Sequence, residues 1–194
     1  YRQIVKLHPL GFWPGFVIGI VYFSYTLWWF WSSFFYLSLL IGSNNILPFL
    51  IILPVFVLTV VSVSLFWGAF SYVIYNFKKP FPFLLPLFYA GVFVLLEYAR
   101  TWFVGIILYG TGGTLGANWT FGNPAYWFSD IGLLRESASY WGIYGVDFFI
   151  IFLSTAIFMS AKPKIKMKYV YLLEILFAIS ILILFSLFSQ THNQ

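Results

Sequence analysis

The sequence contains no cysteine among its 194 residues, and only 8% of its residues are charged. Without cysteine, these residues can form no disulfide, no Cys-ligated metal site and no thiol nucleophile. A soluble domain has about 25% charged residues, so this chain carries too little charge to cover a water-facing surface. In place of charge the sequence has long apolar runs, since 62% of its residues are apolar and 25% are aromatic. Disorder, which requires low hydrophobicity, is therefore excluded as well.

The apolar runs predict an all-α fold, a polytopic membrane helix bundle of about five transmembrane helices. Each crossing takes about 20 apolar residues. We expect a single transmembrane domain, residues 1–194, with spans at about 13–36, 47–75, 83–108, 140–161 and 169–188. Between the third and fourth spans, residues 109–139 form a long loop with six glycines and many aromatic side chains. Loops of this length are usually functional or disordered, and the aromatic residues favour an ordered loop on the membrane surface.

The basic residues predict how the chain is oriented in the membrane. With the N-terminus in the cytoplasm, the three inner segments hold eight basic residues and the outer segments hold only Arg135. Basic residues in short loops favour the cytoplasmic side. The long loop and the C-terminus are therefore predicted to be periplasmic. This explanation also accounts for the net charge of +5, so nucleic-acid binding is not expected.

Glu97 and Arg100 are the ionisable residues that lie deepest in an apolar run. Such residues are costly in a membrane, so they are candidates for function. Their spacing of three places both on one helical face, where they can form an ion pair. Two interpretations remain open: a structural pair with Arg100 extending to the headgroups, or a pair that contacts substrate.

Asp147 and Glu174 are the other acidic residues within predicted spans. A buried carboxylate needs a partner, and Arg100 or a donor from the loop is expected to supply one for Asp147, whose role stays open. Glu174 is expected to be a satisfied surface charge near the inner interface and its lysines. His8 and His192 lie at opposite ends of the chain, so the sequence predicts no metal site, no other cofactor and no hydrolytic triad.

Three segments together resemble the apolipoprotein N-acyltransferase family: Glu97-Tyr98-Ala99-Arg100, Trp119-Thr120-Phe121-Gly122-Asn123-Pro124 and Trp141-Gly142-Ile143-Tyr144-Gly145-Val146. By this resemblance the chain corresponds to roughly the third to seventh of the family's eight membrane helices, and it looks like a piece of a longer protein. The family transfers an acyl chain from a phospholipid to the N-terminal amine of a diacylglyceryl-cysteine lipoprotein. The transfer proceeds through a thioester on a cysteine of a periplasmic nitrilase-like domain.

The resemblance implies a bacterial inner-membrane protein whose partners are membrane phospholipid and a lipoprotein substrate. It implies no catalytic residue in this chain, which alone is expected to be inactive because the nitrilase-like domain and its cysteine are absent from these residues. The residues that it implies for substrate binding are Glu97, Arg100, Trp119, Asn123, Pro124 and Tyr144.

The sequence also departs from the family pattern. Tyr98 and Ala99 replace a Trp-Leu pair, and Asp147 stands where a small residue is usual. Two alternative functions therefore stay open: a small-molecule transporter or channel, and a non-catalytic membrane scaffold. A transporter predicts polar groups along a water-filled path at the middle of the membrane, and the sequence offers almost none.

Overall fold

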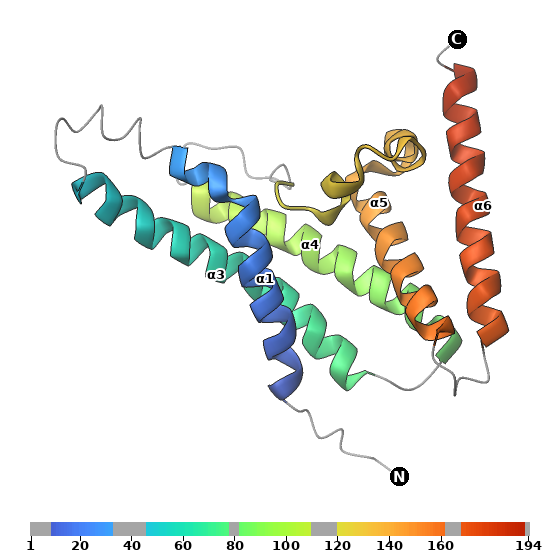
Figure 1. Ribbon diagram of the computed structural model, residues 1–194, viewed down its shortest axis with the longest axis horizontal. Coiled ribbons are helices and arrows are strands. Elements are labelled where there is room, and N and C mark those ends of the chain that lie inside the picture. The colour runs from blue at the N-terminus through green and yellow to red at the C-terminus, as the bar shows by residue number, and fades with distance from the viewer. Residues whose placement is uncertain (1–8, 33–45, 78–81, 110–119, 162–167, 193–194) are drawn as a thin grey trace. The chain divides into compact units, whose positions relative to one another are not determined.

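The computed structural model (Figure 1) describes residues 9–32, 46–77, 82–109, 120–161 and 168–192. These residues form α-helices and short 3-10 helices, the latter labelled η. In chain order the elements are η1 (Pro9–Gly11), α1 (Phe12–Thr26), η2 (Trp28–Trp31), α3 (Ile46–Asn76), η3 (Pro82–Leu84), α4 (Leu85–Tyr109), η5 (Pro124–Phe128), α5 (Gly132–Ser160) and α6 (Lys168–His192). The chain divides into two compact units, residues 1–76 and 77–194, which are described separately.

The all-α membrane prediction is confirmed. Within the described ranges, the helices α3, α4, α5 and α6 are long and apolar enough to cross a membrane. The first predicted span, 13–36, differs, because α1 ends at Thr26 and η2 follows. Consecutive aromatic residues lose side-chain freedom in an α-helix, and the tighter 3-10 turn is common at helix ends. Residues 33–36 lie outside the described part of the chain.

Helix α5 begins at Gly132, inside the predicted loop and before the predicted start of the fourth span. The helix is interrupted at Gly142, whose φ of 66° and ψ of −178° are not helical. Figure 1 shows the two halves of α5 running in different directions. An L-residue with a side chain rarely adopts a positive φ, so glycine is the residue that permits this break. The half that follows the break, residues 143–160, corresponds closely to the predicted span 140–161.

In the first unit, α1 packs against α3 through small residues. Gly15 and Gly19 are spaced four apart on one face of α1, and Gly11 precedes them by the same spacing at the end of η1. A Cβ atom added at Gly19 would lie 3.1 Å from the Cα of Ser64, and Phe12 fills the space beside Gly68. Small residues at this spacing let two membrane helices approach closely.

In the second unit, α5 packs between α4 and α6. The core consists of small and large apolar side chains from all three helices: Ala90, Phe149, Phe152, Ala178 and Leu182. Ser186 of α6 also donates a hydrogen bond to Glu136, in the half of α5 that precedes the break. These contacts hold α4 and both halves of α5 in the arrangement that positions the candidate site.

Candidate functional site

The centre of the candidate site is an ion pair within α4. The Nε and Nη2 atoms of Arg100 donate to the Oε2 atom of Glu97 at 2.9 and 2.7 Å. The pair predicted from the spacing of three is therefore present. Both side chains are buried, with 0% of Arg100 and 1% of Glu97 exposed. Arg100 thus does not extend to an exposed surface, in contrast to the structural interpretation of the sequence.

Arg100 also binds the segment that precedes α5. Its Nη1 atom donates to the carbonyl oxygen of Phe121 at 3.0 Å, and its Nη2 atom donates to Oδ1 of Asn123 at 2.7 Å. A single guanidinium group therefore joins an α4 carboxylate to the backbone and to a side chain of the loop. Hydrogen bonds from a charged donor are about twice as strong as neutral ones, so these bonds fix the loop to α4.

Asp147 attaches the same loop segment to α5. Its Oδ2 atom accepts from Nδ2 of Asn123 at 2.7 Å, and its Oδ1 atom accepts from the backbone N–H of Ala125 at 2.9 Å. The partner expected for Asp147 is thus a loop donor, and the loop supplies two. Asn123 bridges the two helices because its amide oxygen faces the guanidinium group and its amide nitrogen faces the carboxylate.

The local sequence explains how the loop presents Asn123. Gly122 has a φ of 75°, which glycine adopts without strain, and the N–H of Asn123 donates to the carbonyl oxygen of Thr120 to close a turn. Pro124 then begins η5, where its fixed φ suits the first helical position. The side chain of Asn123 is held between α4 and α5 and is completely buried.

Tyr144 lies at the edge of this network. Its hydroxyl group is hydrogen-bonded to Oγ1 of Thr101 at 2.9 Å, and its ring packs edge-on against the ring of Tyr98, with 5.6 Å between the centroids. Tyr98 is 45% exposed. The two tyrosines therefore connect the buried polar groups to the exposed surface of α4.

The structure brings together most of the residues predicted to bind substrate. Glu97, Arg100 and Asn123 form one network, and Pro124 and Tyr144 border it. Trp119 lies outside the described residues. The sequence left the role of Asp147 open and gave no role to Thr101 or Ala125, whose contacts come from residues distant in the chain. The substrate-binding role itself stays a prediction, since the contacts seen here are those of the residues with one another.

Glu174 is half-buried, whereas the sequence predicts a surface charge. Among the described residues, its Oε2 atom is buried and has no hydrogen-bond partner. The neighbouring residues 162–167 lie outside the described ranges. In the same ranges there is no group of three His, Cys, Asp or Glu side chains arranged to hold a metal ion.

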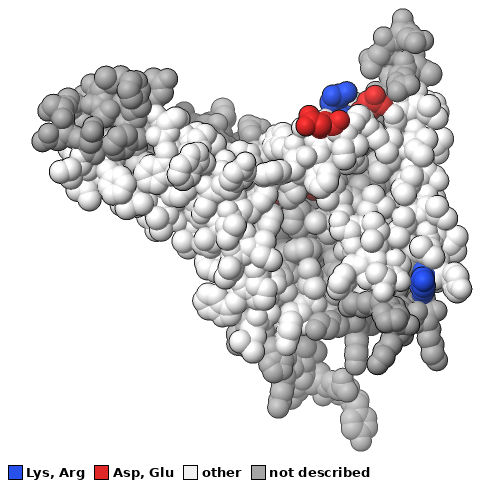
Figure 2. Space-filling model, viewed as in Figure 1, with Lys and Arg blue, Asp and Glu red and all other residues white. Residues whose placement is uncertain are grey.

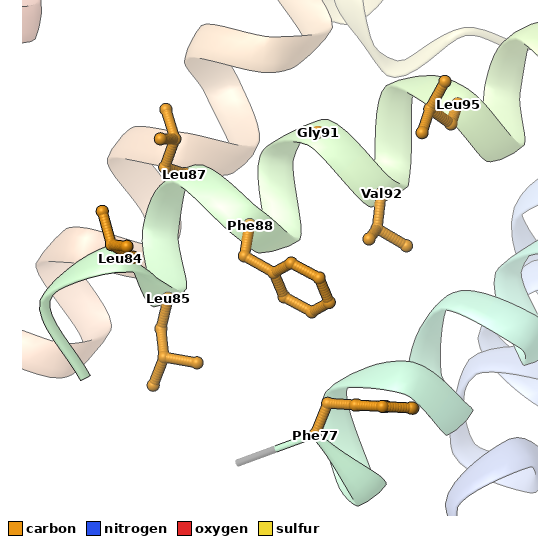
Figure 3. A pocket seen from close by; sticks show the side chains of 8 residues that line it. All are labelled: Phe77, Leu84, Leu85, Leu87, Phe88, Gly91, Val92 and Leu95. Atoms are coloured by element: carbon orange, nitrogen blue, oxygen red, sulfur yellow. The ribbon is translucent and has the colours of Figure 1, made fainter. Parts of the chain in front are cut away.

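An apolar cavity of about 480 Å³ lies along the first half of α4. Figure 3 shows Leu85, Phe88 and Val92 projecting from α4 toward Phe77. Phe77 is fixed there because the hydroxyl group of Tyr89 donates to its carbonyl oxygen at 3.1 Å. The lining residues are all apolar. The helical face of Phe88, Gly91 and Leu95 continues, at spacings of three and four, to Tyr98 beside the polar network.

The arrangement can bind an apolar chain along α4, with one end of that chain beside the rigid polar network. Among the described residues of the site, the hydroxyl groups of Thr101 and Tyr144 are hydrogen-bonded to each other. No family model matches the chain, and neither a curated protein nor a solved structure is significantly similar to it.

Proposed function

We propose that the chain is the membrane part of an apolipoprotein N-acyltransferase-like protein, and that it binds and positions lipid substrates. Its partners would be membrane phospholipid, which donates the acyl chain, and a diacylglyceryl-cysteine lipoprotein, whose N-terminal amine accepts it. The membrane would be the bacterial inner membrane, with the N-terminus in the cytoplasm and the loop and C-terminus in the periplasm.

The observation that supports this proposal most strongly is the convergence of three segments at one site. Arg100 of the first segment is bonded to Asn123 of the second, and Tyr144 of the third segment packs against Tyr98 of the first. Arg100, Asn123 and Tyr144 are each more than 20 positions from the next in the chain, so the resemblance of their segments to the family did not require that the segments meet.

The exposed face of α4 suits the lipid part of the substrate. Phe88 and Leu95 lie on the apolar cavity, and a Cβ atom added at Gly91 would have no neighbour within 4 Å. An alkyl chain on this face would contact apolar side chains along its length, which stabilises its binding. Tyr98 then offers an aromatic ring and a hydroxyl group at the end of the face, where the polar part of a lipid would begin.

The chemical step itself needs a group that these residues do not contain. In the proposed reaction a thiolate attacks the phospholipid ester, forms a thioester and releases the lysophospholipid, and the lipoprotein amine then displaces the thiolate. The 194 residues include no cysteine, so their role is to hold the reactants. We expect the purified chain to transfer no acyl groups.

The scaffold alternative is favoured by one specific observation. Arg100, Asn123 and Asp147 are bonded to one another and to the loop backbone, as expected of a purely structural network. The transporter alternative gains no similar support, because these buried polar groups face one another. Saturable binding of a lipidated substrate distinguishes the proposed function from a scaffold.

The test is the binding of a fluorescent diacylglyceryl-cysteine peptide with a free N-terminal amine to the purified chain in lipid nanodiscs. The expected result is saturable binding that an unlabelled diacylglyceryl peptide displaces and the same peptide without lipid does not. Replacing the exposed ring, Tyr98→Ala, should weaken binding about three- to tenfold, since an aromatic contact contributes about 0.5–1.5 kcal/mol beyond its buried area.

Tyr25→Ala is the matched control, because Tyr25 is an exposed tyrosine of the other unit, with 70% of its side chain exposed. This variant should bind the peptide as the parent chain does. Binding that unlabelled peptide does not displace, or equal losses in the two tyrosine variants, would contradict the proposal and favour a scaffold.

A further inference from the structure

A second cavity, of about 220 Å³, lies where η5 faces both halves of α5. Ala125 and Tyr126 line it from η5, Ala138 lines it from the half of α5 before Gly142, and Val146 lines it from the half after. The cavity therefore depends on the break at Gly142, which turns one half of α5 away from the other. The hydrogen bond from Ala125 to Asp147 holds η5 in place beside it.

Arg135 is the charged residue of this cavity. Its side chain is exposed, and within the described ranges it makes no hydrogen bond or ion pair. Orientation in the membrane does not account for it either. Eight of the nine basic residues outside the predicted spans lie on the predicted cytoplasmic side, and Arg135 is the ninth. The excess of basic residues on the cytoplasmic side therefore gives no reason for Arg135, and binding of an anion would give one.

Two carboxylates lie close to Arg135 in the sequence, and neither forms an ion pair with it among the residues described. Glu136 accepts a hydrogen bond from Ser186 of α6, and Asp130 is exposed. Figure 2 shows red and blue groups close together on an otherwise almost uncharged face. The guanidinium group of Arg135 is thus available to an anion from outside the chain.

The depth of the site in the membrane follows from the length of α5. Residues 143–160 extend over about 27 Å at about 1.5 Å per residue, close to the thickness of a hydrocarbon core. Arg135 lies beyond the break that ends this segment, in the half of α5 that runs in a different direction, so we expect it near the end of the hydrocarbon core, at the level of the lipid headgroups. A phosphodiester with apolar chains attached is the anion that is abundant at this level.

We propose that this cavity binds one phospholipid, with its phosphate group on Arg135 and the adjoining apolar part against Ala138 and Val146. Arginine suits a phosphate because its planar guanidinium group donates two parallel hydrogen bonds. The bound lipid is not consumed. It holds η5 in contact with α5, and this structural role does not depend on acyl transfer.

The test is thermal unfolding of the purified chain in detergent during titration with dihexanoyl phosphatidylglycerol. A saturable rise in the unfolding temperature is expected for the parent chain, because a ligand that binds only the folded state stabilises it. Arg135→Gln should weaken the apparent affinity about tenfold or more, and Arg135→Lys, which keeps the charge, should retain most of it. Ala138→Leu, which fills the cavity, should remove the saturable response.

Matched controls separate the site from general effects of charge and bulk. Lys168→Gln removes an exposed cation elsewhere, and Ser139→Leu adds the same bulk at an exposed position that does not line the cavity; both should respond as the parent chain does. Unchanged responses in Arg135→Gln and Ala138→Leu would overturn the proposal. An equal response to sodium phosphate, or to dihexanoylglycerol without phosphate, would overturn it too, because the site would then not require a phospholipid.

Discussion

Arg100 is the residue on which the position of the loop depends most. Its hydrogen bonds include two to Glu97, one to the carbonyl oxygen of Phe121 and one to Asn123. Arg100, Glu97 and Asn123 are all buried, so water does not readily replace the bonds among them. Removing the guanidinium group would leave a buried carboxylate and two loop acceptors without their strongest donor.

We therefore predict that Arg100→Leu destabilises the chain by about 3–5 kcal/mol, the usual cost of breaking a buried ion pair. The double change Glu97→Leu with Arg100→Leu should recover part of this loss, because it leaves no uncompensated charge. It should not recover all of it, since Phe121 and Asn123 still lose their bonds to α4. Unfolding temperatures in detergent compare the stabilities of the parent chain, the single variant and the double variant.

Lys168→Leu is the matched control for this prediction, because it removes an exposed cation of the same unit. Its effect should stay within about 0.5 kcal/mol, as for most surface changes. The role assigned to Arg100 would be wrong if Arg100→Leu were no less stable than this control. It would also be wrong if the double change were no more stable than Arg100→Leu alone.

At this scale the sequence predicts local contacts better than distant ones. The Glu97–Arg100 pair follows from helical spacing, because both residues lie in one uninterrupted apolar run. The bonds that join Asn123 to Arg100 and Asp147 connect residues 23 and 24 positions apart. Those bonds depend on the turn at Gly122 and on the packing of α4 against α5, neither of which a hydrophobicity pattern encodes.

Among the helices, the packing of α1 against α3 depends on the absence of a side chain at Gly19. A side chain there would meet the backbone of Ser64, since even a Cβ atom would lie 3.1 Å from its Cα. We predict that Gly19→Leu destabilises the chain by about 1–3 kcal/mol, the usual cost of overpacking, measured as a lower unfolding temperature in detergent.

The control for this prediction is Val17→Leu, because Val17 lies in the same helix with 56% of its side chain exposed. The added methylene group there meets no neighbouring helix, so stability should not change. If Gly19→Leu unfolded at the same temperature as Val17→Leu, the close approach of α1 and α3 would not be needed for stability.

Helix α5 shows why the sequence predicted the spanning segments better than the elements beside them. The length of an apolar run predicts which segments can cross a membrane, and the predicted span 140–161 corresponds to the half of α5 after Gly142. The half before it contains Arg135 and Glu136, which interrupt the apolar run, so the sequence predicts a loop there. Its helical structure is stabilised by contacts that the sequence alone does not reveal, such as the hydrogen bond between Ser186 and Glu136.

For the whole molecule, composition alone predicted the class of protein. With 8% charged residues the chain cannot cover itself with a polar surface, and the described helices α3, α4, α5 and α6 are of spanning length. The orientation of these helices is a separate prediction, which follows from the distribution of basic residues. The proposed function depends on it, because the candidate site must open on the side where lipoproteins are acylated.

Two positions in the second unit test this orientation directly. Ser129 and Lys168 are exposed, and the spanning half of α5 separates them in the chain, because Ser129 precedes α5 and Lys168 begins α6. The chain has no cysteine, so Ser129→Cys and Lys168→Cys each introduce a single thiol.

The decisive measurement is the labelling of these two variants by a membrane-impermeant thiol reagent in intact spheroplasts. We predict that the cysteine at position 129 is labelled at once and the cysteine at position 168 only after the membrane is permeabilised. Labelling of position 168 but not of position 129 in intact spheroplasts would place the loop and the buried network at the cytoplasmic face, and would contradict the proposed role in lipoprotein acylation.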